Sequence, residues 1–343
     1  MDTMVEINNY NGALQKPVQS GFNASSTTSD VIKGIDLTGK IALVTGGNTG
    51  IGLETTRALA AAGAIVIVPA RDLEKAKKNL AGIPGVELEE MDMMDSKSID
   101  TFTKKFIASG RPLHLLINNA GIMWVPLRRD ARGIESQLVT NFLAQFELVA
   151  KLWPALKLAN GARVVNVSSS GHHFAPFDFG DPNFENRHYE TLQGYGQSKT
   201  ATILFAVELD NRGKEHNIRA YSLHPGSIGG TELGREAPLE LFQKMGFVDE
   251  NGLLRPEVLA KLKTIPQGAA TTVWCATSPV LNSIGGVYCE NVDVAFLNEG
   301  QVSHQQEHPS TPTGVRDYAV DKVSAQKLWK LAEKMSGVVF DAN

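Results

Sequence analysis

A tyrosine and a lysine stand one helical turn apart in the segment YGQSK, residues 195–199. Positions i and i+4 of a helix lie on the same face, with Cβ atoms about 5–6 Å apart. An ammonium group at Lys199 would favour the phenolate form of Tyr195 and so lower the pKa of the phenol from its usual value near 10. A pKa of about 7 would require roughly 4 kcal/mol, so we expect further positive charge nearby. The alternative is a plain tyrosine and lysine on an amphipathic surface helix.

Two further groups could complete an acid/base site. Three serines, 168–170, end the apolar run RVVNVS, and a hydroxyl there could polarise a carbonyl group. Asn141 lies within a long predicted helix, where an isolated asparagine usually faces solvent or binds local backbone. His172 and His173 follow the serines, but no cysteine stands near them, and we expect no metal.

The composition is that of an ordinary soluble globular protein: 343 residues, 42% hydrophobic, with a net charge of −4. No charge block predicts a nucleic-acid or anionic-membrane partner, and no apolar stretch reaches the roughly 20 residues that span a bilayer. The first residues lack a basic segment followed by an apolar run. Cys275 and Cys289 could pair in principle, but buried thiols in a reducing compartment are expected. We therefore expect a cytoplasmic protein that acts on small molecules.

Short β-rich runs alternate with helical patterns from residue 37 to about 300, which predicts a Rossmann-type, doubly wound parallel sheet with helices on both faces in a single domain. About seven strands are expected, at 41–45, 65–69, 86–90, 114–118, 163–168, 218–223 and 286–290. The predicted helices are 51–62, 72–81, 96–109, 131–159, 194–213 and 267–278.

Three segments depart from this α/β alternation. Residues 1–36 are polar and form an N-terminal extension. Residues 233–265 hold two predicted helices (LGREAPLELFQKMG and RPEVLAKLK) where a strand was due, and an insertion there is a natural cap for a substrate crevice. Residues 301–343 form a C-terminal extension with a loop at 301–314 and a helix at about 319–336, expected to pack on the body through Val323, Leu328, Trp329 and Met335.

The run TGGNTGIG, residues 45–52, follows the first strand and opens the first helix. Its glycines allow a tight turn and a close approach to a ligand, and the helix N-terminus offers free N–H groups to a pyrophosphate. Between a strand and a helix this loop predicts dinucleotide binding. The spacing G-x-x-x-G-x-G is one residue wider than the G-x-G-x-x-G fingerprint.

Together with INNAG (117–121), Asn141, VNVSSS, YGQSK and HPG (224–226), this loop resembles the short-chain dehydrogenase/reductase family in order and spacing, over about residues 37–300. The long segment before Tyr195 and the C-terminal extension are most similar to the retinol-dehydrogenase-like and WW-domain-oxidoreductase-like branch. The resemblance implies hydride transfer between nicotinamide and a carbonyl or alcohol.

The resemblance also implies a role for each catalytic group. Tyr195 is the general acid/base, and Lys199 lowers its pKa and holds the nicotinamide ribose, while the oxidised nicotinamide supplies the further positive charge. Ser169 polarises the carbonyl, with Ser168 and Ser170 structural. Asn141 kinks its helix and positions a relay water that leads to Lys199.

The end of the second strand, IVIVPARD, bears on the choice of cofactor. Ala70 stands where the NAD enzymes of the family carry an acid, and Arg71 could accommodate a 2′-phosphate, so we expect NADP(H) rather than NAD(H). Asp72 is expected to cap the N-terminus of the following helix. Thr45 is expected to connect neighbouring strands rather than to contact the cofactor. The resemblance implies that Asp92 and Met93 lie at the adenine, and that Pro225, Gly226, Ile228 and Thr231 lie at the nicotinamide. The other implied cofactor-binding residues are Gly46, Asn48, Thr49, Gly50, Ile51, Gly52, Arg71, Asn118, Ala120, Gly121, Tyr195 and Lys199.

Two other functions remain open at this point. A catalytically silent NADP(H)-sensing protein would keep the glycines but usually lose Tyr195 or Lys199. A sugar-nucleotide epimerase would have a differently spaced loop and a longer C-terminal domain. Helices 131–159 and 194–213 could pair in a homodimer unless the extensions cover them. A lipophilic ketone or aldehyde is the expected substrate, because aromatic residues could wall the pocket and its cap: Trp124, Phe174, Phe177, Phe242 and Phe247.

Overall fold

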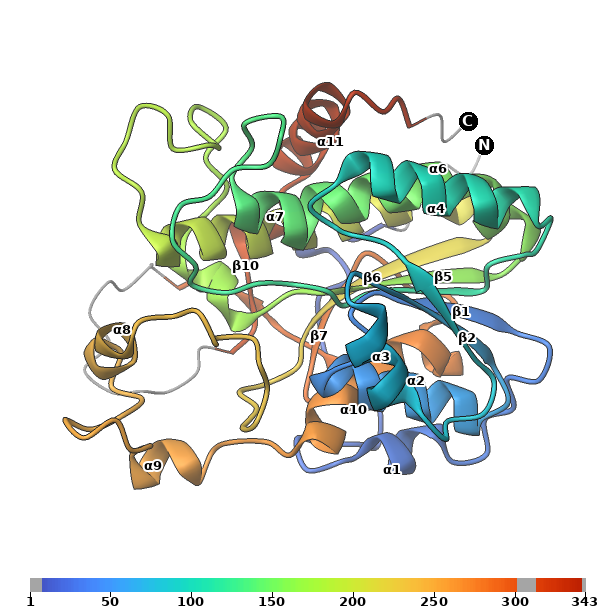
Figure 1. Ribbon diagram of the computed structural model, residues 1–343, viewed down its shortest axis with the longest axis horizontal. Coiled ribbons are helices and arrows are strands. Elements are labelled where there is room, and N and C mark those ends of the chain that lie inside the picture. Colours follow the sequence, from blue (N-terminus) through green and yellow to red (C-terminus); the bar gives the residue numbers. More distant parts are fainter. Residues whose placement is uncertain (1–7, 301–312, 341–343) are drawn as a thin grey trace.

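The computed structural model describes residues 8–300 and 313–340. An eight-stranded sheet with the order β3-β2-β1-β4-β5-β6-β7-β8 forms its centre, and helices cover both faces (Figure 1). The first seven strands are parallel, which confirms the predicted fold, and β8 runs antiparallel to β7 and was not predicted. The strands are β1 Ile41–Val44, β2 Ile65–Ala70, β3 Val86–Glu90, β4 Leu115–Asn118, β5 Ala162–Val167, β6 Ile218–His224, β7 Tyr288–Glu290 and β8 Asp293–Val294.

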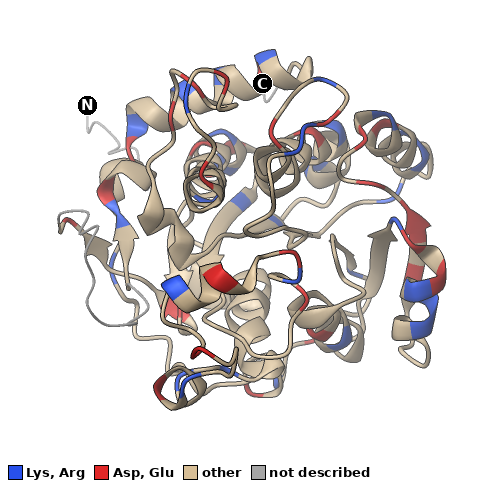
Figure 2. Ribbon diagram, turned by 60° about the vertical axis from the view of Figure 1, so that its left-hand side comes forward, with Lys and Arg blue, Asp and Glu red and all other residues tan. Residues whose placement is uncertain are grey.

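The strand sequences explain the layers. The inner strands β1, β4 and β5 are buried along their whole length, as expected for apolar strands covered on both sides. The edge strand β3 is instead rich in glutamate and only partly buried. Charged side chains accordingly lie mainly on the outer helices, the loops and this edge strand (Figure 2).

Two sets of helices cover the sheet. One face carries α1, α2 and α10, and the other carries α4, α6 and α7 (Figure 1). The helices are α1 Thr28–Ile32, α2 Gly50–Ala61, α3 Leu73–Leu80, α4 Ser96–Ala108, α5 Ser136–Leu138, α6 Ala144–Leu158, α7 Thr191–Gly213, α8 Leu239–Lys244, α9 Pro256–Leu259, α10 Ile265–Thr277 and α11 Lys322–Ser336.

The helix predicted for 131–159 begins later and is not continuous. Gly133 has φ +82°, outside the helical region, and the carboxylate of Glu135 accepts the backbone N–H groups of Gln137 (2.8 Å) and Leu138 (2.7 Å), which starts the helix at Ser136. A π-helical turn, Val139–Leu143, then joins α5 to α6.

The helices predicted in 233–265 are real but short. α8 has six residues and α9 has four, and turns fill much of the remainder. Pro238 and Pro256 stand at the two helix starts, and Gly246, with φ +72°, follows shortly after α8. Proline and glycine therefore confine each helix to one or two turns.

The described part of the N-terminal extension is built into the fold. The hydroxyl of Tyr10 donates to the Glu208 carboxylate on α7 at 2.6 Å. The Gln15 side-chain amide donates to the carbonyl oxygens of Tyr288 and Ala295, both at 2.6 Å. The start of the extension thus packs against α7 and β7, while α1 packs against α10 and α2.

The C-terminal helix α11 packs on α7, but its start and its packing face differ from the prediction. The side chain of Asp321 caps the helix, so it begins at Lys322 rather than at 319. Leu328 and Trp329 are buried, whereas Val323 is 69% exposed and does not pack on the body. α11 covers one face of α7, one of the two helices that the sequence suggested as a possible homodimer contact.

The C-terminal extension also contributes one strand of a small two-stranded sheet that is separate from the central sheet. The predicted loop 301–314 lies almost entirely outside the described residues, but Val315–Arg316 (β10) pairs in parallel with Leu297–Asn298 (β9). Within residues 8–300 and 313–340, no helix combines the length and apolarity needed to cross a membrane.

Candidate active site

Tyr195 and Lys199 face the protein interior from the first turns of α7. Their exposed fractions are 2% and 3%, and the Lys199 Nζ lies 5.7 Å from the centroid of the Tyr195 ring. Nζ donates a hydrogen bond to the Val167 carbonyl oxygen, at the end of β5, at 2.9 Å. The pair is therefore inside the fold, and the surface-helix alternative is excluded by its burial.

Ser169 follows β5 and lies beside Tyr195. The Ser169 hydroxyl oxygen accepts the Gly171 backbone N–H at 2.9 Å, and a hydrogen bond from Ser169 lowers the pKa of Tyr195. Ser168 instead donates to the Lys199 carbonyl oxygen at 2.8 Å, in agreement with the structural role expected for it. Of the three serines, Ser169 is thus the one hydrogen-bonded to the phenol.

The electrostatic expectation for this pair is wrong for the protein without ligands. Burial raises the pKa of Tyr195 to about 12, and the Ser169 hydrogen bond opposes this only in part. Burial also lowers the pKa of Lys199 to about 7. Desolvation disfavours both charged forms, and a lysine that is only about half protonated at neutral pH cannot stabilise a phenolate strongly.

Asn141 lies in the π-helical turn, and its side chain is fully engaged. Its Oδ1 accepts the Ile122 backbone N–H at 2.9 Å, while Nδ2 donates to the Ile122 carbonyl oxygen (3.0 Å) and to the Ser198 hydroxyl (2.9 Å). A Cβ on Gly121 would lie 3.1 Å from Asn141 Oδ1 and 3.4 Å from Lys199 Nζ. Both side chains therefore converge on Gly121.

The glycine loop leaves the N-terminus of α2 open. Asp72 and Asp95 cap α3 and α4 through their side chains, but Thr49 at the start of α2 makes no such hydrogen bond. A Cβ on Gly52 would lie 2.2 Å from the Gly46 carbonyl oxygen, so this turn requires glycine. Uncapped N–H groups beside a close turn fit the phosphates of a dinucleotide.

The loop expected at the nicotinamide lies against the glycine loop. The Thr231 methyl group is 3.7 Å from the position of a Cβ on Gly50, and Ile228 and Ile51 both contact the Cβ position of Gly268. Within the glycine loop, the Asn48 carbonyl oxygen accepts the side-chain amide of Asn79 at 3.0 Å. The structure thus brings together two segments that are far apart in the sequence.

Arg71 directly follows β2, and its exposed side chain has no hydrogen bond or ion pair to any residue in the described ranges. Asp72 accepts the Lys75 backbone N–H at 3.0 Å, which confirms its predicted capping role. The Lys75 ammonium forms a 2.8 Å ion pair with Glu232, which follows Thr231 and directly precedes the cap segment. An uncommitted guanidinium at this strand end fits a 2′-phosphate.

The remaining expected cofactor contacts follow β3 and β4. Asp92 Oδ1 accepts the Met94 backbone N–H at 2.9 Å, with Met93 partly buried between them. Asn118 is fully buried: its Nδ2 donates to Asn166 at 2.9 Å, and its Oδ1 has no hydrogen-bond partner. The orphaned Oδ1 is open to a further donor.

Thr45 connects the end of β1 to the end of β4, as the sequence indicated. Its hydroxyl accepts the backbone N–H groups of Asn119 and Ala120, both at 3.0 Å, and donates to the Ile117 carbonyl oxygen at 3.3 Å. It therefore fixes Ala120 and the adjacent Gly121 at the end of β4.

Sequence reasoning missed two contacts at this site. A Cβ on Gly171 would lie 2.5 Å from Cε1 of Tyr195, so the glycine makes room for the phenol ring. Lys263 lies near the end of the cap, and its side chain lies over Gly226, with Cδ 2.6 Å from the Cβ position of that glycine. Its Nζ donates to Asn291 at 2.9 Å. A small residue two places after Ser169 was the available signal for the first.

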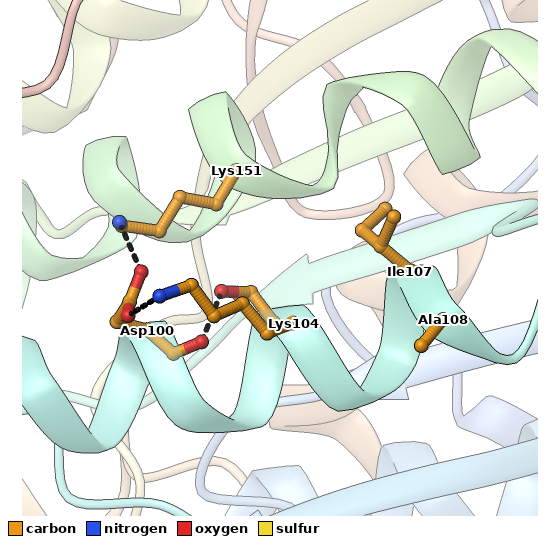
Figure 3. A pocket seen from close by; sticks show the side chains of 6 residues that line it. Asp100, Lys104, Ile107, Ala108 and Lys151 are labelled. Carbon is orange, nitrogen blue, oxygen red and sulfur yellow. Dashed lines mark hydrogen bonds and ion pairs between the residues drawn. The ribbon is translucent and has the colours of Figure 1, made fainter.

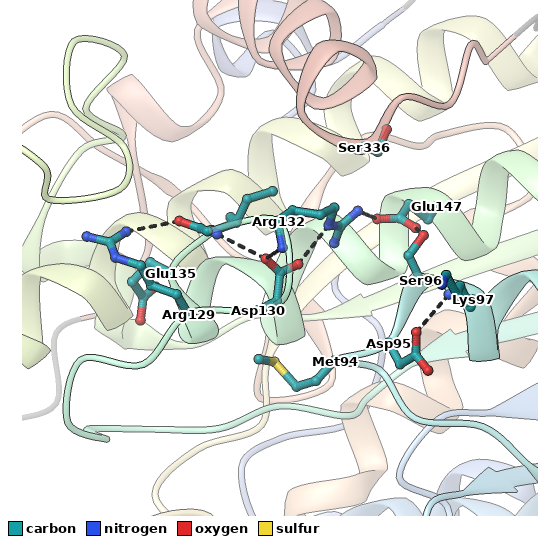
Figure 4. A network of polar contacts seen from close by, with 12 residues as sticks. Met94, Asp95, Ser96, Lys97, Arg129, Asp130, Arg132, Glu135, Glu147 and Ser336 are labelled. Atoms are coloured by element: carbon teal, nitrogen blue, oxygen red, sulfur yellow. Dashed lines mark hydrogen bonds and ion pairs between the residues drawn. The ribbon is translucent and has the colours of Figure 1, made fainter.

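A buried ion-pair network was also missed. Glu147, fully buried in α6, accepts hydrogen bonds from Arg132 (2.5 Å) and the Ser96 hydroxyl (2.6 Å), and Arg132 also pairs with Asp130 at 2.7 Å (Figure 4). The network ties the loop before α5 to the start of α4, next to Met94. A glutamate between Phe146 and Leu148 gave no indication of these partners.

A surface groove between α4 and α6 contains none of the predicted site residues. Asp100 occupies it and pairs with Lys104 (2.7 Å) and Lys151 (2.9 Å), while Ile107 and Ala108 line its other end (Figure 3). These exposed ion pairs contribute little to stability, and the groove offers no acid/base pair of its own.

Aromatic residues join the cap to the loop after β4. The Trp124 ring lies 5.2 Å from Phe242 and 6.1 Å from Phe247, measured between centroids. Phe177, which was considered as a pocket wall, is buried in the hydrophobic core. Cys275 and Cys289 are free buried thiols, as expected.

The described residues contain no group of three or more histidine, cysteine or acidic residues able to hold a metal ion. Backbone groups occupy both ring nitrogens of His172 and the Nε2 of His173. His304 and His308, four positions apart in the sequence, lie outside the described residues.

The fold and the glycine loop define a Rossmann-type dinucleotide-binding protein. The family model described as short chain dehydrogenase matches residues 40–240, and the chain belongs to the short-chain dehydrogenase/reductase family of oxidoreductases, which bind a nicotinamide cofactor. This confirms the resemblance found in the sequence.

Relatives agree with this assignment. A Streptomyces lividans protein named "Probable oxidoreductase" is 41% identical over 303 residues, which cover 86% of this chain and 97% of the relative. Retinol dehydrogenase 11 of Mus musculus is 34% identical, over 83% of this chain and 85% of the relative. A crystal structure of an uncharacterised Mycobacterium paratuberculosis protein superposes with a TM-score of 0.67 at 29% identity, over 92% of this chain and 99% of that chain.

Proposed function

We propose that this protein is an NADP(H)-dependent reductase of lipophilic ketones or aldehydes. The observation that carries the proposal is the buried arrangement of Tyr195, Lys199 and Ser169 at the end of β5. The bound cofactor supplies the hydride, and the chain's own residues bind, orient and protonate.

Tyr195 acts as the proton donor in reduction. With a pKa of about 12, the phenol is protonated at neutral pH and can deliver its proton to an oxygen that gains negative charge. Ser169 polarises the same carbonyl oxygen through its hydroxyl. The reverse reaction requires a phenolate, and hence more positive charge near Tyr195 than Lys199 alone provides in this structure.

Lys199 has two tasks in this proposal: its Nζ holds the nicotinamide ribose, and its charge assists Tyr195. With one N–H donated to the Val167 carbonyl oxygen, the ammonium group keeps two further N–H groups for other acceptors. Asn141 fixes Gly121 beside this Nζ and positions the relay water.

The preference for NADP(H) rests on Arg71. A guanidinium presents a fork of donors that suits a phosphate, and no described residue competes for it. No acidic side chain stands at Ala70, where a ribose 2′-hydroxyl would otherwise find its acceptor.

The substrate class rests on the cap. Trp124, Phe242 and Phe247 form one aromatic cluster between the cap and the loop after β4, and Trp124 is 4% exposed. An aromatic cluster beside the reacting groups would favour an apolar substrate body with a single reacting carbonyl group.

A substrate panel tests the proposal. Aromatic ketones, retinoids and steroids are offered with NADPH or NADH, and cofactor absorbance is followed for wild type and Tyr195→Phe. We expect turnover with NADPH that the variant loses. NADPH binding without turnover on any substrate would instead favour the silent cofactor-sensing protein.

A further inference from the structure

Two histidines hold the single peptide group that joins Ser169 to Ser170, one at its carbonyl oxygen and the other at its N–H. The carbonyl oxygen of Ser169 accepts hydrogen bonds from the backbone N–H of His172 (3.2 Å) and from Nδ1 of the same residue (2.7 Å). The backbone N–H of Ser170 donates to Nδ1 of His224 at 3.1 Å. Both imidazoles are more than nine-tenths buried, at 0% and 7% exposure.

The partners of His172 fix its tautomer. A carbonyl oxygen only accepts, so Nδ1 must carry the proton that it donates to Ser169. The second nitrogen, Nε2, accepts the backbone N–H of Arg316 at 3.2 Å and must be unprotonated. His172 is therefore a neutral imidazole with its proton on Nδ1, and its burial, which holds its pKa well below the usual value, agrees with this.

His224 has the opposite tautomer. Its Nδ1 accepts the Ser170 N–H, so the proton lies on Nε2, which is buried and has no hydrogen-bond partner among the described residues. Lys263 and Lys199 disfavour a second proton on this ring, and burial lowers its pKa to about 3.

His172 also connects Ser169 to the C-terminal extension. Arg316 belongs to β10, and the Tyr318 hydroxyl donates to the His172 carbonyl oxygen at 2.7 Å. Residues more than 140 positions after Ser169 thus contact the segment that positions it. The Arg316 guanidinium lies over the Tyr318 ring, 5.5 Å from its centroid, whereas the contact with His172 is made by the Arg316 backbone N–H.

We propose that His172 and His224 are positioning residues that clamp the Ser169–Ser170 peptide group, His172 at its carbonyl oxygen and His224 at its N–H, and that β10 completes this clamp through His172. The inference rests on the proposed function, in which the Ser169 hydroxyl must meet the carbonyl oxygen of a substrate. A shift of about 1 Å in such a group can lower the rate about 100-fold.

Paired variants separate the two hydrogen bonds of His172. His172→Asn keeps a side-chain amide donor at the δ position, near the Ser169 carbonyl oxygen, and His172→Gln keeps an acceptor at the ε position, near the Arg316 N–H. We expect His172→Gln to lower kcat about 10–100-fold and His172→Asn to lower it less than about 5-fold, with NADPH affinity within about 2-fold in both. Equal losses, or losses that only follow Tm, would overturn the proposal.

A second pair tests the contribution of β10. Arg316 has φ −69°, which proline accepts, so Arg316→Pro removes the N–H and places Cδ against His172 without straining its own backbone. The control Arg316→Ala also lacks the guanidinium but keeps the N–H. We expect Arg316→Pro to lower kcat about 2–5-fold relative to Arg316→Ala, in the range expected for His172→Asn, which loses the same hydrogen bond, and equal kcat values would contradict the role of β10.

Imidazole ¹⁵N shifts test the clamp independently of any activity. In full-length protein at pH 7, His172 should show its proton on Nδ1 and His224 on Nε2, with each assigned from the variant that lacks it. The same tautomer at both residues, or a protonated ring at either, would refute the clamp. If the tautomers are as expected but no carbonyl compound is reduced, the proposed function fails and the geometry of the clamp stands.

Discussion

The ring of Tyr195 occupies the space that a side chain on residue 171 would need: a Cβ on Gly171 would lie 2.5 Å from Cε1 and 2.8 Å from Cδ1. Cβ atoms essentially never approach another heavy atom this closely, so a larger residue must move the aromatic ring. Gly171 also donates its N–H to Ser169, which makes this glycine the point where the segment after β5 meets α7.

We therefore expect Gly171→Ala to displace Tyr195 and lower kcat at least about 10-fold, since small shifts of a reacting group are costly. NADPH affinity, measured by fluorescence titration, should change less than about 2-fold. Gly180→Ala is the matched control, because this exposed glycine meets only the Asp178 side chain, at 3.3 Å. Unchanged kcat in Gly171→Ala would show that the ring tolerates the methyl group.

Tyr195→Phe should leave NADPH binding nearly intact and remove most turnover. The variant keeps the ring but lacks the proton, and positioned acid/base groups contribute about 100- to 10,000-fold in rate. Steady-state kcat and a separate binding titration measure the two effects. Activity within a few-fold of wild type would remove Tyr195 from the role of proton donor.

Arg71→Asp should move cofactor preference toward NADH. A hydrogen bond to a charged group contributes about 1.5–3 kcal/mol, so the ratio of kcat/KM for NADPH to that for NADH should fall at least about 10-fold. Arg57→Asp, at an exposed position within α2, has the same charge change and should leave the ratio near the wild-type value. Equal ratios in all three proteins would exclude a 2′-phosphate contact.

The sequence predicted what local periodicity encodes. The apolar runs of β1, β2 and β5 and the Gly-rich turn before α2 were found to within one or two residues, because burial on both faces and the turn geometry leave a plain residue pattern. The antiparallel β8 has two residues and no periodicity to detect.

Long-range pairing was not predictable in the same way. Glu147 meets Arg132 and Ser96 only after three separate segments fold together, and nothing near any of them in the sequence indicates the others. The link between His172 and Arg316 has the same character. For the protein without ligands, the pKa of Tyr195 was predicted in the wrong direction because the spacing shows the neighbouring charge but not the desolvation of both groups.

Burial of Lys199 should make the stability of the ligand-free protein depend on pH. Its pKa falls from 10.5 to about 7, so between these values the unfolded chain binds a proton that the folded chain has released, and the free energy of unfolding rises with pH. Below pH 7 both states carry the charge, and the folded protein bears the full cost of burying it.

Lys199→Met removes this dependence, and we expect the variant to be more stable than wild type at pH 6 although it is inactive. The advantage should shrink by up to about 1.4 kcal/mol per pH unit between pH 7 and 9. Urea unfolding at pH 6, 7, 8 and 9 measures it, and stopping at pH 9 avoids Tyr195, whose raised pKa lowers stability only above pH 10. If the two stability curves run parallel, Lys199 keeps its proton in the folded state, and the phenol then has a full positive charge beside it before any cofactor binds.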